Sequence, residues 1–274
     1  MAKTPAWVAP RLVCGLGNRL FQVAAAIKTA ERFGSEPVLF LPRMSGTEHG
    51  NFTLLLKLCP SLRIIETAPE WIDIHESNLK SISQASVERP IVLSGFFQNS
   101  DFFPSLTNPL LPKLQSQPQA QAAWAIHFRL GDYCILPHHQ IHDLNKYYCQ
   151  TILKYIPKGS TVRLFSDSPD RLPRISQELS ILGYNSQVFD STDTYETLVA
   201  FSACQAGSIC SNSTFAWWAA YFAYQAQAPS YKAYFPDTWM MNAPTPNILN
   251  LPFTQSIELK SLSAFPCLQS FHYN

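Results

Sequence analysis

Length, composition and charge limit the kinds of protein that this sequence can encode. The chain has 274 residues, a formal net charge of +1 and only 14% charged residues. This balance excludes the broad positive field of a nucleic-acid-binding protein and also an acidic tail. The length allows a full hydrophobic core and predicts one or two domains. Because few residues are charged, much of the surface must be uncharged or apolar, which suits loose association with a membrane.

The N-terminal residues and the cysteines bear on the compartment. Residues 1–7 lack the apolar run of a signal peptide. Seven cysteines are scattered along the chain without a C-x-x-C pair, a pattern typical of reduced thiols in a cytosolic protein. We therefore expect a cytoplasmic protein.

The first predicted unit is a strand over residues 12–14, a turn, and a helix from Leu20 to Gly34. The turn reads Gly15, Leu16, Gly17, Asn18, and glycines there let backbone N–H groups approach an anion closely. The segment lacks the third glycine of the G-x-G-x-x-G fingerprint, so a nicotinamide cofactor is not favoured.

The first half alternates strands with helices or loops. Strands are predicted over residues 38–41, 63–65, 91–93 and 124–127, and this alternation indicates a parallel sheet. Residues 44–51 have the composition of a cleft rim, and residues 104–121 that of a surface connection. We expect an N-terminal domain over residues 1–157.

Residues 127–133 place a cation, an imidazole and a carboxylate where an apolar strand ends. In open α/β sheets ligands bind beyond the carboxyl ends of strands, so Arg129 and Asp132 are expected in a cleft. The alternative is an Arg129–Asp132 ion pair that only braces a turn. His127 could bond a nucleotide or brace its strand.

The second half alternates more strictly and predicts a Rossmann-like domain over residues 158–274. Its expected strands are residues 161–165, 187–189, 208–210 and 231–235, and its expected helices are residues 172–182, 195–206 and 215–224. Residues 197–231 carry no charge, but their amides and hydroxyls would be costly in hydrocarbon. A buried helix–strand–helix unit is favoured over a transmembrane segment.

A hydroxyl-rich turn precedes the predicted helix at residues 215–224. Ser213 and Thr214 would lie near its N-terminus, where N–H groups and the helix dipole favour phosphate oxygens. The alternative is an ordinary helix cap, because Ser and Thr are common capping residues.

Taken together, these segments resemble the α-1,2-fucosyltransferases of glycosyltransferase family 11. Residues 15–22 (GLGNRLFQ) are similar to the family's G-x-G-N-Q-x-F-Q, and residues 127–133 (HFRLGDY) to its H-x-R-x-G-D-Y. Residues 212–218 (NSTFAWW) resemble its N-S-[ST]-F-S-W-W. Smaller likenesses follow in order at residues 93–98, at Tyr147 and Tyr148, and at residues 165–167.

The resemblance implies a GT-B-like α/β architecture in which two Rossmann-like domains face a cleft. It implies a bacterial, cytoplasmic enzyme that transfers L-fucose from GDP-β-L-fucose to the 2-hydroxyl of a terminal galactose in a glycan, with inversion. Neither a metal nor another cofactor is expected, and the chain has no Asp-x-Asp pair. The expected partners are GDP-fucose and a galactose-terminated oligosaccharide, with no nucleic acid.

Carried over residue by residue, the resemblance gives candidate site residues. The catalytic candidates are Arg129, Asp132 and His127. The donor-binding candidates are Gly15, Gly17, Asn18, Arg19, Arg129, Asp167, Glu196, Asn212, Ser213 and Thr214. Two positions depart from the family pattern: Arg19 replaces the usual Gln and adds charge beside the phosphate loop, and Thr197 stands where Asp is common. The nearest carboxylate that could read the guanine base is then Glu196.

The general base and the acceptor site stay open. Asp132 is the nearest carboxylate to Arg129, but that pairing would make it a weak base. His138, His139 and His142 follow on a loop and titrate in a suitable range. Their spacing also fits a metal site, although no cysteine or carboxylate supports one. Glu48 and His49, together with His138 and His139, are the acceptor candidates. Another linkage, a protein acceptor or a non-catalytic glycan-binding role are the alternatives.

Overall fold

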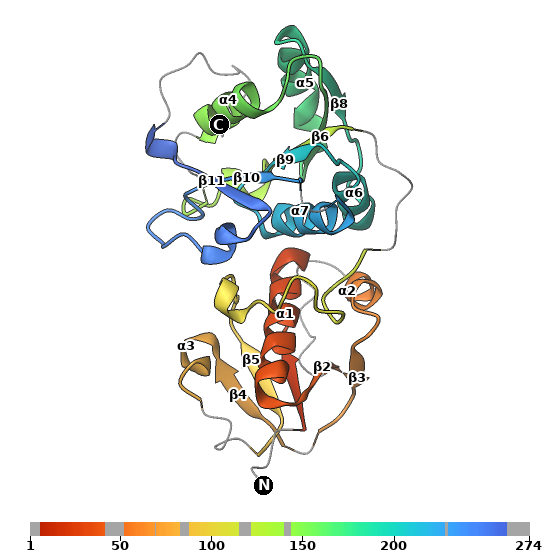
Figure 1. The fold of residues 1–274 in the computed structure, drawn as a ribbon, viewed down its shortest axis with the longest axis vertical. Helices are drawn as coiled ribbons and strands as arrows, with labels where there is room; N and C mark the ends of the chain where they lie inside the picture. The colour runs from red at the N-terminus through yellow and green to blue at the C-terminus, as the bar shows by residue number, and fades with distance from the viewer. Residues whose placement is uncertain are drawn as a thin grey trace. The chain divides into compact units, whose positions relative to one another are not determined.

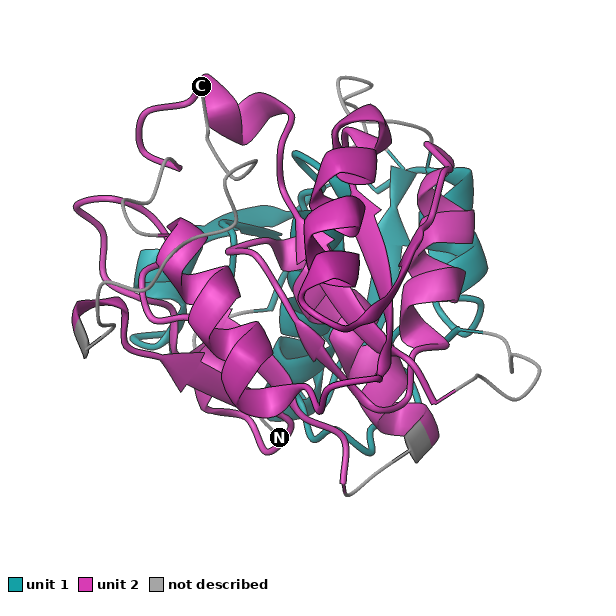
Figure 2. Cartoon of the chain, turned by 90° about the horizontal axis from the view of Figure 1, so that it is seen from above, with its two compact units in different colours: residues 1–114 teal, residues 115–274 magenta. Residues whose placement is uncertain are grey.

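The computed structural model describes residues 6–41, 52–68, 70–82, 88–114, 122–139, 144–227 and 230–261. The chain divides into two compact units, Met1–Leu114 and Gln115–Asn274 (Figure 2). Each unit holds one parallel β-sheet with helices, so the predicted α/β class is confirmed. Glu48, His49 and His142 lie outside the described residues.

The first unit is built on a five-stranded parallel sheet with the order β3-β2-β1-β5-β4 (Figure 1). Its strands are β1 (Trp7–Pro10), β2 (Glu36–Phe40), β3 (Arg63–Ile65), β4 (Ile72–His75) and β5 (Ile91–Ser94). Its α-helices are α1 (Leu16–Phe33), α2 (Thr53–Leu58) and α3 (Glu76–Leu79). Helix α1 connects the parallel neighbours β1 and β2, and its small residues Ala25, Ala26 and Ala30 pack in a buried cluster with Val8 and Ile91.

The strand predicted at residues 12–14 is wrong, because the first strand lies earlier in the chain. Strand β1 is buried along its whole length and pairs with both β2 and β5, so it forms the centre of the sheet. Residues 11–15 form the connection that follows, and α1 already begins at Leu16. Gly17, Asn18 and Arg19 therefore belong to the first turn of the helix and not to a preceding loop.

The second unit is built on a six-stranded parallel sheet with the order β11-β10-β9-β6-β7-β8. Its strands are β6 (Trp124–Phe128), β7 (Thr161–Ser166), β8 (Asn185–Val188), β9 (Gly207–Ile209), β10 (Ala233–Pro236) and β11 (Thr254–Ile257). Its α-helices are α4 (Leu144–Tyr155), α5 (Leu172–Ile181), α6 (Thr194–Ser202) and α7 (Thr214–Gln227). Counted from β6, this is the 3-2-1-4-5-6 order of doubly wound nucleotide-binding sheets.

The predicted boundary at residues 157 and 158 is displaced, because β6 and α4 belong to the second unit. Strand β6 pairs with β7 on one side and with β9 on the other, which makes it the first strand of the second sheet. Helix α4 contributes to the same buried cluster as α5. The units accordingly divide after Leu114.

Both faces of the second sheet are covered. Helices α4 and α5 lie on one side of the strands and α6 and α7 on the other (Figure 1). The uncharged residues 197–231 include most of α6, all of β9 and all of α7, and Trp217, Trp218 and Tyr221 are fully buried. The predicted helix–strand–helix unit is therefore confirmed. Among the described residues, no helix is long and apolar enough to span a bilayer.

Candidate functional site

The loop after β6 holds Arg129 in a defined orientation. Arg129 Nε donates to Asp132 Oδ1 at 3.0 Å and lies 3.2 Å from Asp167 Oδ2, while its Nη2 lies 2.9 Å from Asp132 Oδ1. The guanidinium also lies over the Tyr133 ring, 5.2 Å from its centre. Burial lowers the pKa of Arg129, but Asp167 and Asp132 outweigh this effect and raise it overall, so the cation is permanent.

Asp167 secures the backbone of this loop. Its carboxylate accepts hydrogen bonds from the backbone N–H of Leu130 at 2.8 Å and of Gly131 at 3.1 Å. A Cβ at Gly131 would collide with Asp167 Oδ2, so only glycine permits this approach. Asp167, expected among the donor-binding residues, is thus engaged in positioning Arg129.

His127 lies inside the sheet with its ring against the neighbouring strand end. Only 2% of the residue is exposed, and Nδ1 lies 2.8 Å from Ser211 Oγ. Burial, with a contribution from Arg129, lowers the pKa of His127 to about 3. The imidazole is therefore neutral at physiological pH. Its contact with Ser211 supports the bracing role, one of the two roles that the sequence left open.

The turn before α7 lies next to the Arg129 loop. Strands β6 and β9 are neighbours, and Ser211 N–H donates to the His127 carbonyl at 3.2 Å. Tyr133 Oη donates to the Asn212 carbonyl at 3.4 Å, so the ring beneath Arg129 touches this turn. The structure thus brings together residues 127–133 and 208–218, which the sequence had singled out separately. They meet where the strand order reverses, the position at which open α/β sheets bind ligands.

Asn212 and Ser213 present polar groups at the beginning of α7. Asn212 is fully buried and its Nδ2 donates to the Trp239 carbonyl at 2.8 Å, whereas its buried Oδ1 has no hydrogen-bond partner among the described residues. Ser213 is 4% exposed, and Thr214 is the first residue of the helix. The first turn of α7 contains no acidic residue, so no carboxylate there neutralises the positive end of the helix dipole.

Two tyrosines of α4 donate hydrogen bonds to backbone carbonyls of the central strands and of the residue after β9. Tyr147 Oη donates to the carbonyls of Cys210 at 2.8 Å and Tyr234 at 2.7 Å. Tyr148 Oη donates to the His127 carbonyl at 2.7 Å. The pair on α4 thereby ties β6, β9 and β10 together beneath the site, a structural role for the Tyr147-Tyr148 likeness.

The acceptor candidates at residues 138 and 139 lie near Asp132. The His139 ring stacks on Tyr133 with centroids 4.1 Å apart, and His138 is exposed. Burial lowers the pKa of His139, although Asp132 acts in the opposite direction. The buried His139 Nδ1 has no hydrogen-bond partner among the described residues. His139 thus joins the same cluster as Arg129 and Tyr133.

Glu196 and Thr197 lie in the first turn of α6. Asp193 caps this helix by accepting from the Glu196 N–H at 2.7 Å. Glu196 is exposed and its Oε2 accepts from Ser191 Oγ at 2.8 Å, while Thr197 donates to the Asp193 carbonyl at 2.7 Å. The Thr197 hydroxyl is thus used within the helix, and base reading by Glu196 stays a prediction.

In the first unit, the predicted phosphate loop is the N-terminus of α1. Gly15 caps the helix without a side-chain hydrogen bond, and a Cβ there would meet nothing within 4 Å. Gly17 is buried, and Asn18 Oδ1 accepts from Gln98 Nε2 at 2.9 Å. Arg19 is only 3% exposed and its guanidinium lies 4.7 Å from the centre of the Phe52 ring. Phosphate binding by Arg19 stays a prediction, because its guanidinium packs inside the unit.

Two residues that hold loops in place through hydrogen bonds to the backbone were not predicted. Gln22 bridges two loops of the first unit, accepting from Val13 N–H and donating to the Gly95 carbonyl, both at 3.0 Å. In the second unit, Arg171 Nη1 donates to the Leu130 carbonyl at 2.8 Å. Gln22 lies in the family-like segment 15–22, so that likeness was a usable signal, whereas nothing in the local sequence marks Arg171.

The described residues contain no group of His, Cys, Asp or Glu arranged to hold a metal ion. No protein-family model matches the chain, and no curated protein sequence matches it significantly.

Proposed function

We propose that the protein is an inverting, metal-independent fucosyltransferase that moves L-fucose from GDP-β-L-fucose to the 2-hydroxyl of a terminal galactose. The proposal includes the GT-B-like arrangement that the family resemblance implies. The observation that carries it is the position of Arg129. A permanent, oriented cation stands at the switch point of a doubly wound sheet, beside the N-terminus of α7.

The chemistry explains why these groups belong together. When the fucosyl bond breaks, negative charge builds on the leaving GDP, and a preoriented cation lowers the barrier by stabilising that charge. Arg129 offers a planar fork suited to phosphate oxygens, and the N–H groups at the beginning of α7 add partial positive charge.

The proton of the acceptor hydroxyl needs an acceptor group during attack. Asp132 is the more exposed of the two carboxylates that contact Arg129, with 43% of its side chain exposed against 20% for Asp167. Asp167 is occupied by two backbone N–H groups. We assign the proton to Asp132, with the neighbouring His139 as the alternative within the same cluster.

Titration calorimetry in the presence of EDTA tests the donor assignment. GDP and GDP-fucose should bind without a divalent ion. Loss of binding on chelation would contradict the metal-free site, and tighter binding of NAD than of GDP would point to a dehydrogenase. Measuring GDP release against a panel of galactosides then tests the acceptor, because a non-catalytic glycan-binding protein would bind GDP-fucose and release nothing.

Arg129→Lys tests the residue that carries the proposal. An ammonium keeps the charge but loses the fork, so kcat/KM should fall by roughly 2–4 kcal/mol in transition-state stabilisation. Arg174→Lys, an exposed arginine on α5, is the matched control and should leave the rate unchanged. Near-normal turnover in a folded Arg129→Lys protein would show that Arg129 only stabilises its loop.

A further inference from the structure

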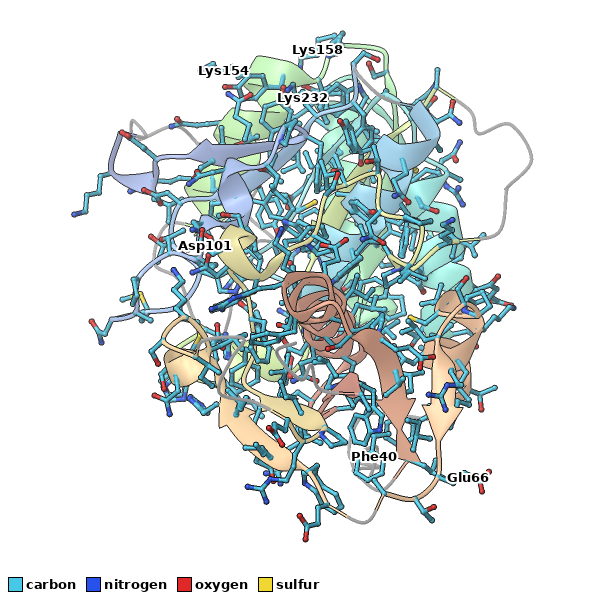
Figure 3. The ribbon with its side chains drawn as sticks, turned by 60° about the horizontal axis from the view of Figure 1, so that its bottom comes forward. Phe40, Glu66, Asp101, Lys154, Lys158 and Lys232 are labelled. Carbon is cyan, nitrogen blue, oxygen red and sulfur yellow. The ribbon has the colours of Figure 1, made fainter. Side chains whose placement is uncertain are left out.

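Lysines gather at the amino-terminal edge of the second sheet, opposite the edge that carries the candidate site. Lys154 at the end of α4, Lys158 before β7 and Lys232 before β10 lie at the same end of the second unit (Figure 3). Lys158 donates to the Leu182 carbonyl, and Lys232 Nζ donates to the Pro252 carbonyl at 2.7 Å. All of these positions are at the amino-terminal edge of the sheet.

Charge is divided unequally between the two edges. Every strand of the sheet except β9 is followed within four residues by an acidic side chain, namely Asp132, Asp167, Asp190, Asp237 and Glu258. At the amino-terminal edge, residues 152–163 and 230–236 contain Lys154, Lys158 and Lys232 and no acidic residue, and residues 122–126 and 179–189 contain no charged residue. Glu178, in the last turn of α5, is the acidic residue that borders this edge. With three lysines and one bordering carboxylate, this edge carries a net positive charge, whereas the opposite edge carries five acidic side chains.

Aliphatic side chains are exposed among these lysines. Ile181 and Leu182, at the end of α5, are 79% and 36% exposed, and Leu153 on α4 is 39% exposed. The ends of α4 and α5 are joined here, because Tyr184 Oη donates to the carbonyls of Ile152 and Ile156 at 3.4 Å. We call Leu153, Lys154, Lys158, Ile181, Leu182 and Lys232 the lysine face.

Aromatic rings form the partly buried base of the lysine face. Tyr155 stacks on Tyr234 with centroids 4.1 Å apart, and Trp124 stacks on the same Tyr234 at 6.4 Å. Lys154 Nζ lies 5.0 Å from the centre of the Tyr155 ring. Tyr and Trp beside lysines and exposed aliphatic residues are the composition of protein surfaces that enter the headgroup region of a bilayer.

We propose that the lysine face binds the surface of a membrane that contains anionic lipid. Lys154, Lys158 and Lys232 complement the negative surface potential. The exposed Ile181 and Leu182 supply apolar area that enters the boundary between headgroups and acyl chains. A nucleic acid would use the lysines but leave these aliphatic side chains in water. The inference does not depend on the proposed fucosyl transfer.

Flotation of the full chain with vesicles tests this proposal. The protein should float with vesicles of phosphatidylglycerol in phosphatidylcholine at low salt, and much less with phosphatidylcholine alone or at high salt, where surface charges are screened. Ile181→Ser should lower the partition coefficient roughly tenfold by removing inserted apolar area. The double variant Lys154→Gln with Lys232→Gln should lower it by roughly fivefold for each lysine.

Two controls are matched to these variants. Ile135 is 78% exposed in the loop after β6, so Ile135→Ser removes an equally exposed isoleucine from the opposite edge and should leave vesicle binding unchanged. Lys260→Gln removes an exposed lysine from that same edge. The proposal is overturned if the wild-type protein does not float with the anionic vesicles. It is also overturned if Ile135→Ser and Ile181→Ser reduce vesicle binding equally. A change of oligomeric mass in Ile181→Ser by sedimentation velocity with vesicle binding retained would overturn it too, since the face would then serve a second copy of the chain.

Discussion

Arg129 shows how neighbouring side chains can prepare one cation for a ligand. Two carboxylates orient its guanidinium through Nε and Nη2, and one of them is anchored by backbone N–H groups. Orientation of this kind removes the entropy cost of ordering a long side chain when a ligand binds. Asp132 and Asp167 both contact Arg129, but only Asp167 also holds the loop, so the two should respond differently to substitution.

Neutral amides at these two positions separate the roles. Asp132→Asn should leave GDP-fucose affinity and the free energy of unfolding nearly unchanged but abolish transfer to galactosides, because the proposed proton acceptor is lost. Asp167→Asn should lower the free energy of unfolding by roughly 1–3 kcal/mol, since it weakens the acceptor for two N–H groups. Donor titration, urea unfolding and rate measurements on both variants check this. Full activity in Asp132→Asn would move the proton to His139, and a parallel loss of donor affinity and rate would limit Asp132 to orienting Arg129.

His127 should make folding sensitive to acid. Its pKa is about 3 in the folded protein and 6.5 in the unfolded chain, so protons bind preferentially to the unfolded chain between these values. Its stabilising effect is complete above pH 6.5 and should decline by roughly 1.4 kcal/mol for each pH unit below it. Urea unfolding between pH 7 and pH 5 measures the slope. His127→Asn, which can still bond Ser211, should be less steep, and an identical slope would place the titration elsewhere.

At the scale of single elements, α4 supports the site from below. The hydroxyl of Tyr147 donates to the carbonyl of Cys210, directly after β9, at 2.8 Å and to that of Tyr234, within β10, at 2.7 Å. Tyr147→Phe should therefore lower the free energy of unfolding by about 1–2 kcal/mol, as measured by urea denaturation. Tyr184 is similarly buried but donates at 3.4 Å, so Tyr184→Phe is the control and should cost less than about 0.5 kcal/mol. Equal losses would show that hydrogen-bond length does not decide the effect.

The beginning of α1 offers a complementary experiment. Gly15 has φ of −72°, which any residue adopts, and a Cβ there would meet open space. Gly15→Ala should thus leave thermal unfolding unchanged. If a ligand phosphate approaches this turn, as the family resemblance implies, the added methyl group should weaken GDP binding, on the order of tenfold, by separating the anion from the backbone N–H groups. Unchanged affinity would remove Gly15 from the donor site.

At the scale of the whole molecule, each unit has its own sheet and its own buried clusters. The second unit contains a complete doubly wound strand order with helices on both faces. Expressed alone, residues 115–274 should unfold cooperatively in urea and bind GDP, because Arg129 and the turn before α7 both lie within this unit. Arg129→Lys in the same fragment should bind GDP more weakly. A cooperatively folded fragment that does not bind GDP would show that the nucleotide requires residues of the first unit.

Several elements could be predicted because their signals are local. The strand at residues 63–65, the helix near residues 172–182 and the uncharged helix–strand–helix segment followed from apolar patterning and turn residues. Strand β1 was misplaced because residues 7–10 and 12–14 are both short apolar runs, and only pairing with β2 and β5 distinguishes them. The domain boundary failed for the same reason, since the partners of β6 are not encoded in its own residues.

Local sequence was enough to identify the chemical groups of the candidate site and to show that Arg129 and the Asn212–Ser213–Thr214 turn each follow a strand. Backbone propensity and apolar spacing are short-range properties, so they can be read along the chain. The folded chain was needed to show that the two segments meet at the switch point, that Asp167 anchors the Arg129 loop, and that His127 is buried and neutral. Burial and hydrogen-bond partners arise from residues far apart in the chain, such as Arg129 and Asp167 or His127 and Ser211, and packing alone brings them together.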